Sequence, residues 1–535
     1  MIFICPERIL VVERSPHSPE FKFFNYYIPE KFTLEEEKIL EPFFSNVNRP
    51  VFVATGLPEE LTGALIARHS QSEESMRRIF LDEFVKDRKM ALLWRELQNS
   101  LGGREFLDLG RANRFFKKHF VGFGHDSIAA PIPLVIGLER ISQLGAKGIE
   151  DTRIGLSPIE RSTRYGFFGE KIDGKYLYAR SPVIMSSPYA ELYEKSIDGA
   201  LDLYAELQEP VREAYRKKFP HLKEDKIKRM TFDTTRVLLV AGNLTNLGAM
   251  INGQAVEYMI FKLKASELVE HQEIGQMLEE EIAKVTPALV QRIRGDFGQR
   301  AIEYLANRQK EQEALAEKYL TGIEPKKIKK GPILTDWDPQ GENKVIAKIL
   351  WQGRNLSDHQ VLKVVSQLSL EDKVRIIDRY LGQRPDRRSK PGRALEEAIL
   401  SFQIILRFAE WRDLQRNRIL TPFWRRLDYS LGVDVGRDLQ EFGFGEVVEE
   451  RLNQLAEAHA IISKDYPVEA QYMVAFGTLM PYLITLNFRE LVYIAELRTE
   501  LGNHPGYAKI AREMAEQGKD AYPLLGRALK FVHWR

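Results

Sequence analysis

The order of apolar and polar residues predicts a chain made mainly of helices. Apolar residues recur every three or four positions, the period of an amphipathic helix, in six stretches. These stretches are 57–98, 188–218, 266–317, 344–383, 394–418 and 445–464. Strand-like runs are fewer: the N-terminal MIFICPERILVVERS predicts a strand, and TFDTTRVLLVAG (231–242) fits either element. We expect a helix-rich α/β or α+β fold.

One segment breaks the helical period and predicts a boundary between two domains. Residues 318–344 contain three prolines and three glycines, and the basic run KKIKK occupies 326–330. A solvated linker explains four lysines without interleaved aromatic residues better than a targeting or nucleic-acid patch. The expected division is a first domain over 1–325, a linker over 326–340 and a second, shorter domain over 341–535.

The two parts share a stretch of similar sequence. LLVAGNLTNLGAMINGQAVEYMIFKL (238–263) overlays MVAFGTLMPYLITLNFRELVYIAELR (473–498) without a gap, at a constant offset of 487 − 252 = 235 residues. The matched pairs are Gly242 and Gly477, Leu244 and Leu479, Asn252 and Asn487, and Tyr258 and Tyr493. Helical apolar patterns also match by chance, so a duplication is predicted only if other motifs pair in the same order.

Composition is that of an ordinary protein without a general attraction to polyanions. The 535 residues include 78 basic and 76 acidic side chains, so an anion must be met locally. The single cysteine, Cys5, excludes an internal disulfide and a multi-thiolate zinc site, and no metal is expected. Apolar runs such as APIPLVIGL (130–138) are shorter than the roughly 20 residues that cross a bilayer. We expect a cytoplasmic protein that binds neither nucleic acid nor membrane.

The first part contains GFGHDSI (122–128), which carries His125 and Ser127 behind a glycine. A histidine after a helix-terminating glycine is more often a C-cap residue than a ligand-binding group. Both interpretations stay open for His125.

A second motif, RIGLSPIERSTRY (153–165), follows in the same part. Residues 157–160 fit a capping box with proline at the first helical position. The remaining Ser162, Arg164 and Tyr165 offer a hydroxyl, a guanidinium and a phenol, which suit a phosphate or a planar imide.

In the second part, arginines cluster behind an apolar run. RDLQRNRILTP (412–422) follows ILSFQIILRFAEW (399–411), which we interpret as a buried helix. Arginines in the last turn of a helix complement its dipole by roughly 0.3–1 kcal/mol, and this explanation competes with binding of an anion.

A helix is predicted for NFRELVYIAELR (487–498), where Asn487 and Arg498 share one face and Arg489 is turned away by about 200°. If this face meets the RNR triplet (416–418), up to three guanidinium groups converge. Such a cluster is costly unless an anionic ligand neutralises it.

These motifs, in this order, resemble those of the flavin-dependent thymidylate synthases. That family's signature is Arg-His-Arg followed by Ser-x-Arg-Tyr, with Gly-His-x-Ser/Thr before it and an Asn-x-Arg helix ending in Leu-Arg after it. GHDSI and ERSTRY match in the first part, whereas RNR and NFRELVYIAELR match in the second. The losses are complementary: DTR (151–153) replaces Arg-His-Arg and Leu263 replaces the last arginine in the first part, and no Ser-x-Arg-Tyr follows RNR.

The resemblance implies two fused, divergent copies of that family's domain, which form a pseudo-dimer with one composite site. Its implied catalytic residues are Arg164, Arg416 and Arg498. Its implied substrate-binding residues are Glu160, Ser162, Arg164, Tyr165, Arg416 and Arg498. The flavin side is implied to contain His125, Ser127, Arg153, Asn417, Arg418, Asn487 and Arg489.

The implied reaction is reductive methylation of dUMP to dTMP by methylenetetrahydrofolate, with FAD carrying hydride from NADPH. Two chains are expected to pair into a pseudo-tetramer. Asn417 stands where the family has a histidine that meets the flavin. The alternative is therefore a catalytically inactive nucleotide- or flavin-binding homologue with a regulatory or assembly role, and a more remote one is a helical scaffold whose arginines only cap helices.

Overall fold

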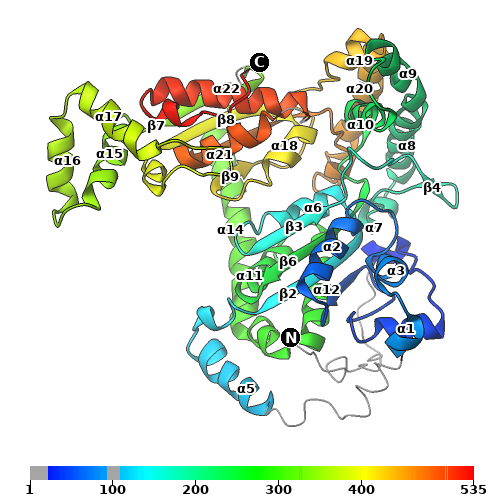
Figure 1. Ribbon diagram of the computed structural model, residues 1–535. Coiled ribbons are helices and arrows are strands. Elements are labelled where there is room, and N and C mark those ends of the chain that lie inside the picture. The colour runs from blue at the N-terminus through cyan, green and yellow to red at the C-terminus, as the bar shows by residue number, and fades with distance from the viewer. Residues whose placement is uncertain are drawn as a thin grey trace. The chain divides into compact units, whose positions relative to one another are not determined.

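The computed structural model describes residues 22–92, 109–324, 326, 328–500, 502 and 504–534. The chain divides into two units, each built around its own four-stranded antiparallel sheet (Figure 1). Unit 1 contains Met1–Glu324 and Val435–Phe476, and unit 2 contains Pro325–Asp434 and Gly477–Arg535. Helices outnumber strands in both units, which confirms the expected helix-rich mixed class. The predicted N-terminal strand and Cys5 lie outside the described residues.

Unit 1 arranges its sheet in the order β1-β2-β6-β3. Its strands are β1 (Val51–Ala54), β2 (Pro133–Ser142), β3 (Leu156–Glu160) and β6 (Leu244–Asn252), with a small hairpin of β4 (Lys171–Ile172) and β5 (Lys175–Tyr176). Its helices are α1 (Leu34–Leu40), α2 (Glu59–His69), α3 (Met76–Ile79), α5 (Leu109–Phe116), α6 (Gln143–Glu150), α7 (Pro182–Met185), α8 (Ala190–Glu206), α9 (Gln208–Lys218), α10 (Glu224–Thr235), α11 (Gly253–Lys264), α12 (Val269–Val285), α13 (Pro287–Arg294), α14 (Asp296–Leu320), α19 (Arg437–Glu441) and α20 (Gly445–Ile462).

Unit 2 arranges its sheet in the order β7-β8-β10-β9. Its strands are β7 (Gly331–Trp337), β8 (Ile399–Arg407), β9 (Leu420–Trp424) and β10 (Leu479–Asn487). Its helices are α15 (Gly341–Trp351), α16 (Asp358–Ser366), α17 (Leu370–Leu381), α18 (Phe408–Leu414), α21 (Phe488–Arg498) and α22 (Pro505–Ala521).

The two sheets have the same strand order: first, second, fourth and third along the chain. In both units the second strand runs straight into a short helix (α6 or α18), and the fourth runs straight into a longer one (α11 or α21). Strand β10 begins 235 residues after β6 (Leu479 against Leu244), and α21 begins 235 residues after α11 (Phe488 against Gly253). The gap-free overlay of the two sequences therefore pairs a strand with a strand and a helix with a helix.

The interpretation of 399–411 as a helix is wrong for most of its length. Residues Ile399–Arg407 form β8, which pairs with β7 on one side and β10 on the other. A strand in the middle of a sheet buries an apolar run as completely as a helix does, so the run alone does not distinguish the two. Only α18 (Phe408–Leu414) at its end is helical.

The capping box predicted at 157–160 is also wrong, because these residues belong to β3 at the edge of the sheet. Pro158 pairs with Ala249 of β6. Proline lacks an N–H group to donate, and an edge strand has one side on which none is needed.

The expected linker contains regular structure. Residues Gly331–Trp337 form β7, the edge strand of the unit 2 sheet, paired to β8. Three prolines and three glycines around it break the helical period without preventing a short edge strand. Along the chain, Glu324 is the last residue of the first segment of unit 1, and 435–476 returns to that unit.

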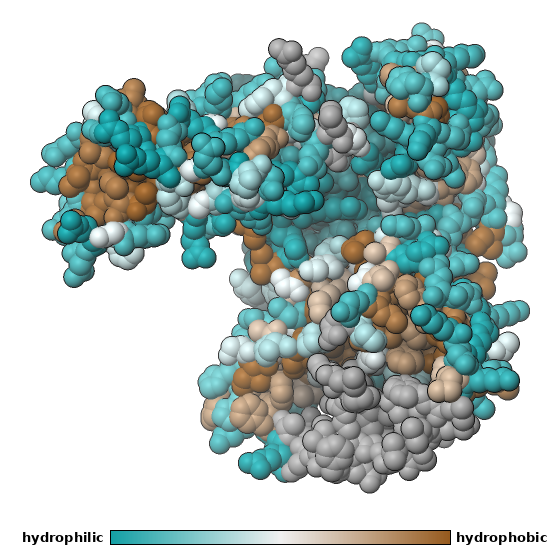
Figure 2. Space-filling model, viewed as in Figure 1, coloured by the Kyte–Doolittle hydropathy of each residue, from teal (hydrophilic) through white to brown (hydrophobic). Residues whose placement is uncertain are grey.

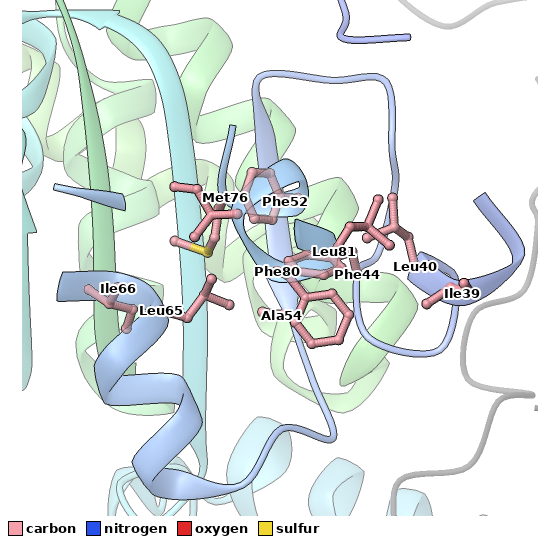
Figure 3. Close-up of a cluster of buried hydrophobic side chains, with 11 residues drawn as sticks. Ile39, Leu40, Phe44, Phe52, Ala54, Leu65, Ile66, Met76, Phe80 and Leu81 are labelled. Carbon is pink, nitrogen blue, oxygen red and sulfur yellow. The ribbon is translucent and has the colours of Figure 1, made fainter. Parts of the chain in front are cut away.

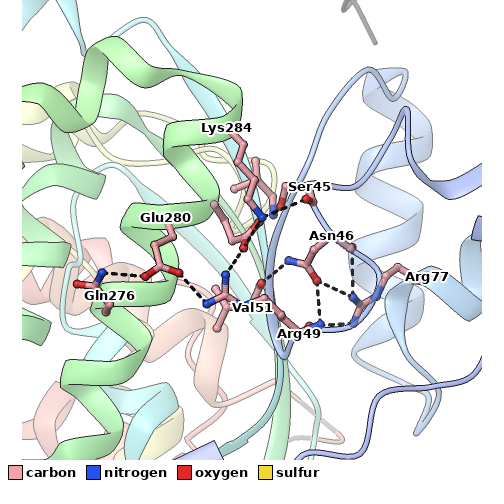
Figure 4. A network of polar contacts seen from close by, with 10 residues as sticks. Ser45, Asn46, Arg49, Val51, Arg77, Gln276, Glu280 and Lys284 are labelled. Carbon is pink, nitrogen blue, oxygen red and sulfur yellow. Dashed lines mark hydrogen bonds and ion pairs between the residues drawn. The ribbon is translucent and has the colours of Figure 1, made fainter. Parts of the chain in front are cut away.

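A cluster of buried apolar side chains joins β1 to α2 and α3 in unit 1 (Figure 3). Phe44, Phe52 and Phe80 make edge-to-face contacts at its centre, with ring centroids 5.5–5.6 Å apart. Beside it, Arg49 connects the turn before β1 to α12 through Glu280 at 2.8 Å and Glu281 at 2.7 Å (Figure 4). These contacts hold α12 against the edge of the sheet.

The face seen in Figure 2 is mostly polar, with apolar side chains gathered over α15–α17 and over parts of unit 1. Exposed apolar side chains of the segment 341–381 include Trp351, Leu356, Val364 and Leu370. In the described parts of the chain, each helix is too short or too polar to cross a membrane.

Candidate functional site

In unit 1, the residues after β3 form a tight turn. The Ser162 hydroxyl accepts a hydrogen bond from the Arg164 backbone N–H at 3.2 Å, and the Ser162 carbonyl accepts one from the Tyr165 N–H. Arg164 pairs with Asp233 of α10 at 3.0 Å. Tyr165 is 54% exposed. The turn therefore presents a phenol and a half-buried guanidinium on the surface of unit 1.

Glu160, at the end of β3, is held inside the protein. Its carboxylate accepts a hydrogen bond from the Lys147 ammonium at 2.8 Å, and Lys147 also pairs with Glu150. All three side chains are almost completely buried. The ion pair of this enclosed carboxylate with Lys147 fixes α6 against β3.

Arg153 lies in the turn that follows α6. Its backbone has a φ of +58°, in the left-handed region that non-glycine residues rarely adopt, and its N–H donates to the Glu150 carbonyl at 3.1 Å. The side chain is half-buried.

The GHDSI motif forms an exposed turn held by its aspartate. Gly124 has a φ of +68°, and the His125 N–H donates to the His119 carbonyl at 3.0 Å, as expected for a helix-terminating glycine. His125 and Ser127 are exposed, whereas Asp126 pairs with the buried Arg292 at 2.7 Å. Arg292 also forms a two-bond pair with Glu257 of α11.

In unit 2, the C-terminal residue of α21 meets the end of α18. The Arg498 guanidinium donates to the backbone carbonyl of Asp413 at 2.9 Å and lies 5.4 Å from the ring centre of Tyr507. Its Nε is buried and has no hydrogen-bond partner among the described residues. Arg498 thus bonds to α18 three residues before the RNR triplet, and the convergence of its guanidinium with those of Arg416 and Arg418 stays a prediction.

The triplet itself turns out of α18. Arg416 and Arg418 are exposed, whereas Asn417 between them is buried. The Asn417 side-chain amide donates to the Leu414 carbonyl at 2.9 Å, and its backbone N–H donates to the same carbonyl at 3.0 Å. Asn417 thus closes the helix, which leaves the two arginines on the surface on either side of it.

A pocket lies at the N-terminal end of α21 and encloses about 490 Å³ of space, including its open mouth. Two sequence-predicted residues line it. Asn487 caps the helix by accepting from the Glu490 N–H at 2.9 Å, and Arg489 pairs with Glu396 at 2.6 Å. The other lining residues are Arg384, Arg387, Lys390, Pro391, Glu396, Ile419, Glu490, Val492, Tyr493 and Glu496.

Sequence reasoning missed Glu490, which is 8% exposed and lines this pocket. Burial raises the pKa of its carboxyl group to about 7, although the positive charges of Lys390 and Arg489 act in the opposite direction. The sequence did contain a feature that points to this residue. Glu490 is the third residue after Asn487, and the third residue after an N-cap lies in the first turn of the helix, beside the cap.

The structure assembles the predicted residues in separate groups within each unit. Unit 2 brings Arg498 to the helix end before Arg416 and places Asn487 and Arg489 in one pocket. The composite pocket that joins residues of both parts stays a prediction.

Relatives of this chain are similar over nearly its whole length. A UPF0159 protein of Chlamydia muridarum is 30% identical, covering 94% of this chain and 96% of the relative. A UPF0159 protein of Chlamydia pneumoniae is also 30% identical with the same coverage, and one of Thermoplasma acidophilum is 26% identical over 88% of this chain and 95% of its own. No family model matches the sequence. The chain belongs to the UPF0159 protein family.

Proposed function

We propose that the chain is a flavin-dependent thymidylate synthase-like enzyme made of two fused, divergent copies of one domain. The common strand order of the two sheets and the constant offset of 235 residues between β6–α11 and β10–α21 support the duplication. Asparagine caps the helix after the fourth strand in both units, with Asn252 in unit 1 and Asn487 in unit 2.

The observation that carries the proposal is the contact of Arg498 with the end of α18. It brings a guanidinium with an unpartnered, buried Nε to the helix end that leads into the exposed Arg416. Guanidinium groups bind phosphate through two parallel hydrogen bonds, and fixed positive charge stabilises negative charge that develops in a transition state. These residues fit a nucleoside monophosphate such as dUMP.

The proposed flavin residues in unit 2 are Asn417, Arg418, Asn487 and Arg489. Arg489, which is paired with Glu396, lines the pocket, and Asn487 holds the first turn of α21. In unit 1 we propose His125, Ser127 and Arg153 for the flavin, with Glu160, Ser162, Arg164 and Tyr165 for the substrate. A bound FAD supplies hydride transfer, with NADPH and methylenetetrahydrofolate as co-substrates. The protein groups bind and orient the reactants.

The test is a titration of the FAD-loaded protein with dUMP, followed by flavin absorbance. We expect a spectral shift that saturates and that Arg498→Ala and Arg416→Ala abolish. Arg375→Ala is the matched control, because Arg375 lies on α17 and pairs within its own helix with Glu371 and Asp372. Absence of both flavin binding and dUMP binding contradicts the proposal.

A catalytically silent nucleotide- or flavin-binding role is the second candidate, and Asn417 favours it. Its amide is buried and bonded to Leu414, so it offers no titratable ring to a reactant. A spectral shift without turnover supports this candidate. Pairing of two chains into a pseudo-tetramer is part of the first proposal, and sedimentation of the full chain measures it.

A further inference from the structure

The pocket at the start of α21 contains four cationic side chains, three of which have carboxylate partners. Arg384 forms a two-bond pair with Glu496 at 2.9 and 2.6 Å, Arg387 pairs with Glu500, and Arg489 pairs with Glu396. The fourth cation, Lys390, is exposed, and its ammonium lies 5.2 Å from the ring centre of Tyr493. Lys390 has no carboxylate within ion-pair distance in the parts of the chain that the structure describes.

Glu490 is the second unusual group in the pocket. Less than a tenth of its surface is exposed, and no side chain or backbone group of the described residues donates a hydrogen bond to its carboxyl group. A buried carboxyl without a donor favours its neutral form, in which it becomes a hydrogen-bond donor. The pocket thus pairs an unengaged ammonium with a carboxyl that can donate a proton.

We propose that this pocket binds an oxyanion of the phosphate class between the Lys390 ammonium and the protonated carboxyl group of Glu490, and that binding takes up a proton. An ionised Glu490 repels the anion, whereas a neutral one donates a hydrogen bond to it. The site lies in the same pocket as Asn487 and Arg489, which we propose for the flavin, and it is separate from the proposed nucleotide-phosphate residues Arg416 and Arg498.

Among the charged groups that line the pocket, Glu490 is the one whose charge changes near neutral pH. Arg489, Tyr493 and Glu496 face it from α21, Arg384, Arg387 and Lys390 from the loop 382–391, and Glu396 from the turn Arg393–Glu397. The three arginine–carboxylate pairs are neutral together. Protonation of Glu490 therefore changes the pocket from nearly neutral to positively charged.

The aligned positions of unit 1 do not carry the same residues. At the offset of 235 residues, Gln254 stands for Arg489 and Ala255 stands for Glu490. At these two positions the proton-sensitive carboxyl and its neighbouring arginine are therefore present in unit 2 and absent from unit 1.

Sulfate is the appropriate probe, because it keeps two negative charges between pH 6 and pH 8. Calorimetric titration of the full chain should give an affinity about tenfold weaker at pH 8 than at pH 6, because the protonated fraction of a group that titrates near 7 falls by about that factor. In two buffers with different heats of ionisation, sulfate binding at pH 8 should take up close to one proton, because about nine tenths of a group that titrates near 7 is ionised there before binding.

Three variants test whether Glu490 and Lys390 form the anion site. Glu490→Gln keeps a neutral donor at every pH, so it should bind sulfate equally at pH 6 and pH 8, without proton uptake. Lys390→Met should weaken binding at least tenfold, whereas Lys509→Met, which alters an exposed lysine of α22, should not. Unchanged proton uptake in Glu490→Gln, or equal affinities of the two lysine variants, overturns the proposal.

Two further measurements distinguish this site from other anion sites and identify the kind of phosphate that it binds. The pH-dependent binding should persist in Arg498→Ala, and its loss there would overturn the independence of the site. Displacement of sulfate by methyl phosphate as well as by inorganic phosphate indicates a phosphate ester as the natural ligand. Displacement by inorganic phosphate alone indicates the free ion.

Discussion

At the scale of single residues, buried charge in this protein is held by dense hydrogen bonding. Arg77 is 1% exposed and pairs with Glu139 at 2.7 Å. Glu139 also accepts from the Met76 N–H at 2.9 Å and from the Tyr27 hydroxyl at 3.2 Å, and the guanidinium lies 4.4 Å from the ring centre of Phe52. Neither charge has access to water, so each depends on the other.

We expect Glu139→Gln to destabilise unit 1 by about 3–5 kcal/mol, because it leaves the Arg77 charge buried without a counter-ion. The exposed pair of Arg68 and Glu83 is the control, and Arg68→Met should cost about 0–1 kcal/mol. Thermal unfolding of the three proteins measures the difference. Equal melting temperatures of the two variants would contradict this account of the buried pair.

The pair of Arg77 and Glu139 also determines how the stability of unit 1 should change with acid. Burial acts to raise the pKa of Glu139, but the Arg77 guanidinium and the hydrogen bonds that the carboxylate accepts outweigh it and hold the pKa below its ordinary 4.5. The stabilisation is therefore complete above about pH 4.5 and is lost as the pH falls through the lowered pKa. In Glu139→Gln this part of the acid dependence should be absent from the melting curve.

For Glu490 we predict the opposite dependence of stability on pH. Its pKa is raised to about 7 by burial, so its contribution to stability is greatest below about pH 4.5 and is lost as the pH rises through 7. Glu490→Gln should raise the free energy of unfolding at pH 8 by about 3 kcal/mol, and by less at pH 5.5. Stabilisation of equal size at both pH values would show that burial does not control this carboxyl.

At the scale of elements, the two asparagine caps offer a matched comparison. Asn252 accepts from the Ala255 N–H at 2.8 Å, and Asn487 accepts from the Glu490 N–H at 2.9 Å. Each alanine substitution should cost about 1 kcal/mol of stability. Only Asn487→Ala should also weaken sulfate binding, because only this cap positions a pocket residue. An equal loss of binding in Asn252→Ala would contradict the assignment of the pocket to unit 2.

The elements that the sequence predicted well are those with a local signal. The helix predicted over 487–498 from its apolar period is α21 (Phe488–Arg498), and Asn487 is the N-cap before it. The segments 157–160 and 399–407 were misassigned because their identity depends on neighbours far away in the chain. Pro158 is tolerated because β3 is an edge strand, and β8 is a strand because β7 and β10 pair with it.

In the candidate site, too, features with a local sequence signal were predicted and those that depend on distant residues were not. Helical spacing placed Arg498 on one face with Asn487, but it gave a meeting of this face with the RNR triplet only as a condition. In the structure Arg498 bonds to the Asp413 carbonyl, three residues before Arg416. Glu490 and Lys390 were not found, since they come together only when the loop 382–391 folds over α21. Their significance depends on burial, which a single sequence does not display.

At the scale of the whole molecule, the chain crosses from one unit to the other and back. Residues 435–476 belong to unit 1, where α20 packs against α8. Ile197 and Leu201 of α8 and Leu452 and Leu455 of α20 are fully buried, and Tyr215 donates to Asp438 at 2.9 Å. Unit 1 is therefore incomplete without a segment from the second half of the sequence.

This arrangement predicts how fragments behave. Residues 1–324 expressed alone should aggregate, because α8 loses its cover and exposes apolar surface. Co-expression with 325–535 should recover soluble protein containing both fragments, as measured by size-exclusion chromatography. A soluble, cooperatively melting fragment of residues 1–324 alone would contradict the division of units.

The measurement that tests the central proposal most directly is conversion of dUMP to dTMP by the purified full chain. The mixture contains FAD, NADPH and methylenetetrahydrofolate, and the nucleotides are separated and identified by mass spectrometry. We predict dTMP formation that requires all three additions and disappears in Arg498→Ala but not in Arg375→Ala. Binding of FAD and dUMP without any dTMP would contradict the enzymatic proposal and leave the ligand-binding homologue in its place.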